Sequence, residues 1–217
     1  MKVKWLGHAS FLITSDKGTR IITDPYTPGV FGLEYKPIKE SADIVTMSHN
    51  HDDHNNVNSI PGKPQIVKGA GKQQAKGIEL RGTASCHDEC GGKERGDNTI
   101  FTFTIDDIKI CHLGDLGRLL TDKEIDEIGK VDVLMIPVGG FFTIDAAAAD
   151  KVIAQLKPRV VFPMHYQTDS CPKFPVASAD PFLKGKKNVK KIDSPSTELK
   201  AGQLPRDTQI YVLKHEL

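Results

Sequence analysis

Short apolar and alternating runs fill the first half of the chain and predict β-strands. Residues 11–14 and 19–23 flank the turn Ser15-Asp16-Lys17-Gly18, a pattern that predicts an antiparallel hairpin. Residues 42–47 form an apolar run that ends at Ser48, as expected of a buried strand. Further strands are predicted at residues 3–5, 65–67, 78–80, 100–105 and 109–112.

Two helices and three more strands are predicted in the second half. Thr121 and Glu124 have the spacing of a capping box in front of an apolar helical pattern, and Asp145 precedes an alanine-rich stretch that runs to about residue 156. Strands are predicted at residues 133–136, 160–163 and 209–213. Because helices and strands alternate here, we predict a layered α/β or αββα architecture.

The composition narrows the class of protein. The chain has 217 residues, of which 38% are apolar and 26% charged, and we expect residues 1–217 to form a single domain. A formal net charge of +1 makes nucleic acid an unexpected partner. No apolar run approaches the roughly 20 residues that span a bilayer, and the N-terminus does not resemble a signal peptide. We therefore expect a cytoplasmic protein with no membrane association.

The four cysteines form no C-x-x-C pair, and a chain of this length does not need disulfides to stabilise its core. We therefore expect reduced thiols. Cys86 and Cys90 flank His87, which leaves a metal-linked or redox role open for that pair.

A cluster of imidazoles and carboxylates follows the predicted strand at residues 42–47. The segment reads Ser-His-Asn-His-Asp-Asp-His over residues 48–54. In an extended segment His49 and His51 point to the same side and can bind one metal ion, while a following turn would direct Asp53 and His54 towards a second position. A two-metal site is predicted, with a histidine-rich surface loop as the alternative.

Three more ligand-type residues lie where apolar runs end. His87 follows residues 83–85, Asp115 follows residues 109–112, and His165 follows residues 160–164. Because two metal ions need more ligands than one loop offers, we expect these residues to complete the site.

This arrangement resembles the metallo-β-lactamase superfamily, whose H-x-H-x-D-H loop is matched by His49-Asn50-His51-Asp52-Asp53-His54. The resemblance implies a four-layer αββα sandwich. It also implies that His49, His51 and His87 hold one metal, that Asp53, His54 and His165 hold the other, and that Asp115 bridges them. Asp24 would support the ligand loop as a hydrogen-bond acceptor. Motifs at residues 7–10, 137–143 and 163–166 resemble small stand-alone hydrolases related to ascorbate-6-phosphate lactonase.

Two divalent transition metals would activate a hydroxide for hydrolysis of an ester, lactone or phosphoester. We expect zinc, with manganese and iron as the alternatives. Asp53 could also accept a proton, and His8 could support an oxyanion or leaving group, or be structural. Lys93 or Arg95 could meet a small anionic substrate, unless the glycine-rich segment around them is a plain turn. For His112 we favour a structural role.

Three other functions compete with this interpretation. The same metal pair could serve a phosphodiesterase or nuclease, although the sequence shows no broad basic face. A di-iron redox centre would be expected to carry a carboxylate where His51 stands. A non-catalytic metal-binding protein would be expected to lack a ligand, and none is missing. A homo-oligomer is compatible with the sequence.

Overall fold

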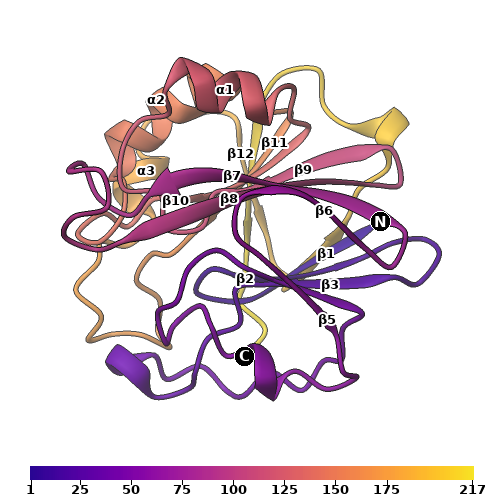
Figure 1. The fold of residues 1–217 in the computed structure, drawn as a ribbon. Coiled ribbons are helices and arrows are strands. Elements are labelled where there is room, and N and C mark those ends of the chain that lie inside the picture. The colour runs from indigo at the N-terminus through magenta and orange to yellow at the C-terminus, as the bar shows by residue number, and fades with distance from the viewer.

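The computed structural model describes residues 1–217, and two β-sheets face each other in it (Figure 1). The six-stranded sheet has the order β13 (Ser196–Glu198), β1 (Lys2–Gly7), β2 (Ser10–Thr14), β3 (Arg20–Thr23), β4 (Ile44–Met47) and β5 (Gln65–Lys68). The eight-stranded sheet has the order β12 (Val189–Ile192), β14 (Gln209–Leu213), β11 (Val160–Met164), β10 (Val133–Pro137), β9 (Ile108–His112), β8 (Asp97–Ile105), β7 (Ile78–Cys86) and β6 (Gly71–Ala75). The predicted hairpin is β2–β3, with Leu12 opposite Ile22.

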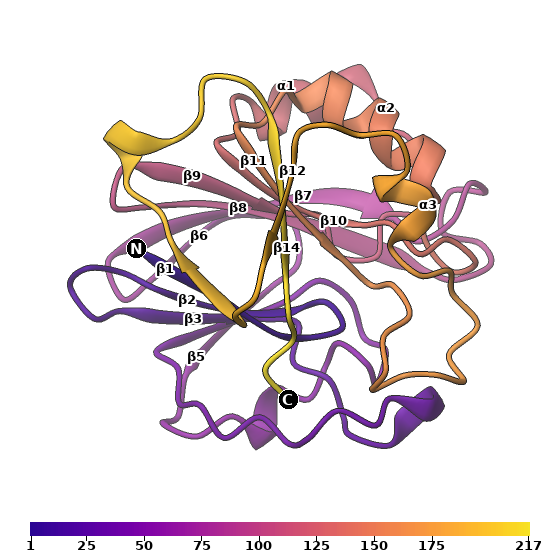
Figure 2. The same ribbon diagram turned by 180° about the vertical axis from the view of Figure 1, so that it is seen from behind.

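Helices cover the outer face of the eight-stranded sheet (Figures 1 and 2). They are α1 (Asp122–Ile128), α2 (Ala146–Leu156) and the short α3 (Asp180–Leu183). Both predicted helix starts are confirmed, because Thr121 and Glu124 form a capping box and the Asp145 carboxylate accepts a hydrogen bond from the backbone of Ala148. None of these helices is long and apolar enough to cross a membrane.

The outer face of the six-stranded sheet is covered by loops instead of α-helices. They contain the 3₁₀ turns η1 (Val30–Gly32) and η2 (Val57–Ser59), and a third such turn, η3 (Ala201–Gln203), precedes β14. Pro25, Pro28 and Pro37 remove backbone donors from the first of these loops, which explains why it forms no helix. The four-layer α/β architecture is confirmed, with one outer layer built from loops.

Two apolar clusters stabilise these layers. The larger one has 43 buried residues and joins the two sheets to α1 and α2. The smaller one has 13 and lies beneath the covering loops, where Tyr26, Tyr35 and Phe174 are almost fully buried. The edge of the sandwich where the ligand-bearing loops meet is therefore supported from both sides.

The strands missing from the sequence prediction are β6, β12 and β13. All three lie at the edges of their sheets, where polar residues face water and the apolar alternation is lost. β7 also runs further than predicted, to Cys86 instead of residue 80, so that His87 follows directly on a strand end.

Candidate metal centre

Each residue of the predicted metal site lies just beyond the C-terminal end of a strand. The strands and the residues that follow them are β1 with His8, β3 with Asp24, β4 with His49 to His54, β7 with His87, β9 with Asp115 and β11 with His165. Parallel pairing of β3 with β4, and of β10 with both β9 and β11, brings these ends to the same edge of the sandwich. Residues far apart in the sequence, such as His8 and His165, thus meet at one place.

Asp115 lies at the centre of the cluster. Its Oδ2 atom is 3.2 Å from Nε2 of His87 and 3.2 Å from Nε2 of His165. Its Oδ1 atom is 3.2 Å from Nε2 of His54, and Nε2 of His49 lies 3.9 Å from Oδ2. Only 1% of Asp115 is exposed, so its carboxylate is surrounded by imidazoles and shielded from bulk water.

Two groups of side chains lie around Asp115, and His49 and His54 also form a third group with Asp24. His49, His51 and His87 form one group whose ligand atoms lie within 4.8 Å of one another. Asp53, His54 and His165 form the other together with His8. The structure thus assembles both ligand sets that the superfamily resemblance implies, and it adds His8 to the second.

The donor atoms of this cluster fit transition-metal ions. Nε2 of His49, Nε2 of His54 and Nε2 of His165 are buried and have no hydrogen-bond partner in the protein, and the same is true of Oδ1 of Asp115. Buried polar atoms without partners are costly to a folded protein, and imidazole nitrogens with carboxylate oxygens suit zinc, manganese and iron. The cluster is therefore able to hold metal ions.

Asp24 sets the proton positions of two histidines. Its Oδ2 atom accepts hydrogen bonds from Nδ1 of His54 at 2.9 Å and from the Ser48 hydroxyl at 2.5 Å, and its Oδ1 atom accepts one from the Ser48 backbone. The Ser48 oxygen in turn lies 2.9 Å from Nδ1 of His49. Both imidazoles therefore donate from Nδ1, and their Nε2 atoms face the cluster.

His8 contacts the cluster through Asp53. Its Nε2 atom lies 3.1 Å from Oδ2 of Asp53, and its ring centre is 4.2 Å from that of His165. The residue is 1% exposed and has a φ of 50°, a left-handed conformation that few non-glycine residues adopt. His8 does not line the pocket above the cluster, so its position fits support of Asp53 better than contact with an oxyanion.

Asn98, which no sequence motif marks, orients the Asp115 loop together with His112. The Asn98 side chain donates to the backbone carbonyl of Leu113 at 2.9 Å and accepts from the backbone of Asp115 at 3.1 Å. His112 donates from Nε2 to the carbonyl of Ala9 at 2.8 Å and accepts from the backbone of Gly114. This geometry agrees with the structural role that we favoured for His112.

Burial and charge set the protonation of these groups. Burial, aided by the neighbouring His54, lowers the pKa of His49 to about 3, and burial with His165 lowers that of His8 to about 4. Burial also opposes the charged form of His54, but the carboxylates of Asp115 and Asp53 outweigh it and raise the His54 pKa well above its usual range. His49 is thus neutral at pH 7 and able to bind a metal ion through Nε2.

A second residue that the sequence analysis overlooked, Asp88, anchors the glycine-rich loop after His87. Its carboxylate accepts four backbone hydrogen bonds of 2.8–2.9 Å, from Cys90, Gly92, Glu94 and Arg95. These bonds lower the Asp88 pKa to about 2, and the bond from the Arg95 backbone contributes most. The loop is therefore more than a plain turn, since one carboxylate sets its path.

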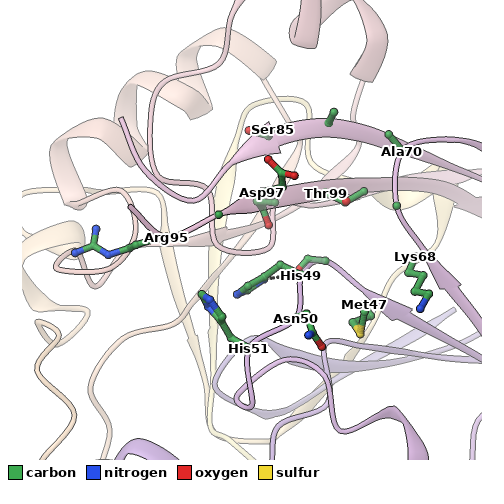
Figure 3. A pocket seen from close by; sticks show the side chains of 15 residues that line it. Met47, His49, Asn50, His51, Lys68, Ala70, Ser85, Arg95, Asp97 and Thr99 are labelled. Carbon is green, nitrogen blue, oxygen red and sulfur yellow. Dashed lines mark hydrogen bonds between the residues drawn. The ribbon is translucent and has the colours of Figure 1, made fainter. Parts of the chain in front are cut away.

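Two cavities adjoin the cluster. A pocket of about 240 Å³ lies directly against His51, Asp53, His87 and Asp115. A more open groove of about 730 Å³ runs between the two sheets; Figure 3 shows Arg95 and Lys68 at its opposite ends, with the two histidines His49 and His51 between them.

Of the two cations predicted to meet substrate, only Arg95 lines these cavities. Lys93 lies on the same loop and lines neither. All four cysteines are free, and Cys86 and Cys90 join no metal-ligating group.

Comparison with known proteins agrees with this geometry. The sequence profile of the β-lactamase superfamily domain matches residues 2–165. The chain belongs to the metallo-β-lactamase superfamily. It is 30% identical to a UPF0173 metal-dependent hydrolase of Thermococcus onnurineus over 83% of this chain and 89% of the relative, and 31% identical to one of Pyrococcus horikoshii over 92% and 99%.

A solved structure extends the likeness to the whole chain. The Thermotoga maritima protein, assigned as a Zn-dependent hydrolase of the metallo-β-lactamase superfamily, matches with a TM-score of 0.81 and 32% identity over 99% of both chains. The predicted superfamily and fold are confirmed, and the chain is a hydrolase of this superfamily.

Proposed function

We propose that this protein uses two divalent transition metals, zinc foremost, to hydrolyse an ester, lactone or phosphoester of a small anionic substrate. One observation carries the proposal: Asp115 lies between two groups of histidines, and the buried Nε2 atoms of His49, His54 and His165 form no hydrogen bond within the protein. Such a pair of ions supplies Lewis-acid stabilisation of negative charge and lowers the pKa of water enough for attack at neutral pH.

Each chain residue then has a defined task. His49, His51 and His87 would hold one ion, Asp53, His54 and His165 the other, and Asp115 would contact both. Asp53 lines the pocket, which supports a second task for it as acceptor of the proton released by water. His8 would keep the Asp53 carboxylate in place through the 3.1 Å contact.

Hydrolysis of a phosphodiester is the alternative function. The groove of about 730 Å³ that reaches His49 and His51 is lined by two cations, Lys68 and Arg95, which could follow a phosphate-bearing substrate. A chain with a net charge of +1 lacks the strong overall field expected of a nuclease, so we rank this function second.

A metal-reconstituted screen separates these functions. Sugar lactones, carboxylic esters, thioesters, phosphomonoesters, phosphodiesters and β-lactams would be tested with zinc, manganese and iron. We expect turnover of an ester, lactone or phosphoester, lost with a chelator and reduced about 100-fold or more by Asp115→Ala. Asp193→Ala, at an exposed carboxylate outside the cluster, is the matched control. If the metal-loaded protein hydrolyses none of these compounds, the proposal is wrong.

A further inference from the structure

The pocket of about 240 Å³ combines three phenylalanines with one arginine. Phe31, Phe142 and Phe174 form its apolar wall, and Arg95 lies beside them. The wall faces the candidate metal ligands of the same pocket. Because a cavity of roughly 150 Å³ is large enough for benzene, this pocket has room for one aromatic ring and a few further atoms.

Phe31 and Phe142 are placed to contact a ligand. The Phe31 side chain lines the pocket and is 62% exposed, so it has apolar surface that a bound ligand could cover. The Phe142 ring lies 5.4 Å from that of Phe174, which is itself 3% exposed and anchored in the smaller core. An aromatic ligand would pack beside this tilted pair of rings and cover Phe31.

Arg95 places a positively charged group at the same pocket, and contacts with Phe142 and Asp88 fix its position. Its guanidinium lies 5.6 Å from the centre of the Phe142 ring and donates to the Phe142 carbonyl, while its backbone is bound by Asp88. It forms no ion pair with any carboxylate of the chain, and Glu94, which also lines the pocket, instead accepts a weak hydrogen bond from Cys90. The guanidinium can therefore bind an anionic group through two parallel hydrogen bonds.

We propose that the substrate is a small aromatic ester that carries a carboxylate, with its ring against Phe142 and Phe174 and its carboxylate on Arg95. This inference rests on the proposed hydrolase function and names its substrate class. In the reaction, the oxygen of water bonds to the acyl carbon, the bond from that carbon to the ester oxygen breaks, and the departing oxygen takes a proton.

The test compares matched esters on the zinc-loaded protein. 4-Acetoxybenzoate and monophenyl succinate place the carboxylate on the leaving group and on the acyl group, and 4-methylphenyl acetate and phenyl butanoate are their neutral counterparts. We expect at least one anionic ester to have a kcat/KM about tenfold or more above its counterpart. Arg95→Gln should remove this preference, lowering kcat/KM for that ester about 10- to 100-fold, while Lys93→Gln on the same loop should not.

Binding provides a readout that does not depend on turnover. Benzoate binding is measured by calorimetry on the same zinc-loaded variants, with acetate and benzyl alcohol as partial mimics. Arg95→Gln should weaken benzoate binding about tenfold or more, and Phe142→Leu should weaken benzoate about 2- to 10-fold without affecting acetate.

The outcomes separate the two proposals. Hydrolysis of esters with no preference for the anionic members, or with a preference that Arg95→Gln leaves intact, overturns the substrate class and leaves the hydrolase function standing. Absence of ester hydrolysis also overturns the substrate class, and absence of hydrolysis across the whole metal-reconstituted screen overturns the function itself. In that case Arg95-dependent benzoate binding would still support the pocket as an aromatic-carboxylate site, and benzoate binding unaffected by Arg95→Gln would overturn it as well.

Discussion

Replacing Asp24 with asparagine tests how the protein prepares its histidines for metal. In the native chain the carboxylate accepts from Nδ1 of His54 and from the Ser48 hydroxyl, which holds Nδ1 of His49 in turn. In the Asp24→Asn variant, the new amide group would donate where the carboxylate accepted. Nδ1 of His54 would then lose its acceptor and its proton, which leaves a proton on Nε2, the nitrogen that faces Asp115, and Ser48 could turn its hydroxyl to His49 with the same result.

The expected loss follows from these contacts. Removing one supporting partner of a metal-ligating histidine costs about 10- to 100-fold in metal affinity. Because Asp24 serves two histidines, we expect Asp24→Asn to weaken zinc binding about 100-fold, or about 2.7 kcal/mol. Ser48→Ala interrupts only the path to His49 and should cost about tenfold.

Competition with a chromophoric zinc chelator measures these affinities, and circular dichroism checks that each variant is folded. Asp43→Asn is the matched control, because Asp43 accepts a backbone hydrogen bond from Arg20 but lies outside the cluster. A folded Asp24→Asn protein that binds zinc within twofold of the native affinity would refute the reasoning.

Two further changes test the fold around the site. A Cβ atom at Gly114, where φ is +54°, would lie 2.3 Å from Oδ1 of Asn98. Gly114→Ala should therefore lower the free energy of unfolding by about 2–4 kcal/mol, measured by urea titration. Gly77 also has a positive φ but no atom within 4 Å of the added Cβ, so Gly77→Ala should cost only about 1–2 kcal/mol. Glu124, 5% exposed, caps α1 and pairs with Arg118, and Glu124→Gln should cost about 1–2 kcal/mol at pH 7. Burial raises the Glu124 pKa, but Arg118 and Thr121 together outweigh burial and lower that pKa. The stability difference should therefore be fully present above about pH 5.5 and shrink as the pH falls through and below about 4.3. Equal costs for the two glycines, or a Glu124 difference that does not change with pH, would count against the contacts described.

The candidate ligand residues could be recognised because the signals that mark them are local in the sequence. His49, His51, Asp53 and His54 lie in one short loop, and the remaining ligand-type residues each follow an apolar run that ends abruptly. Strand ends are where loops begin, so this pattern places the side chains at one edge of the sheets. The capping box of Thr121 and Glu124 was readable for the same reason, since it depends on residues three apart.

The supporting groups could not be predicted, because their roles depend on contacts between distant segments. Asn98 lies within an ordinary strand sequence and acts only because the loop of Asp115 passes beside it. Asp88 was equally hidden, although an acidic residue just before a glycine-rich turn could have suggested backbone capping. The direction of His8 depends on its left-handed backbone, which the sequence pattern does not reveal.

Metal content after reconstitution tests the central claim most directly. The protein would be stripped with a chelator, incubated with zinc, manganese or iron, desalted, and its metal quantified by plasma mass spectrometry against protein concentration. We predict about two ions per chain for at least one of these metals, and fewer for Asp115→Asn, whose side chain lies between both groups of histidines. A folded native protein that retains none of the three metals would contradict the account.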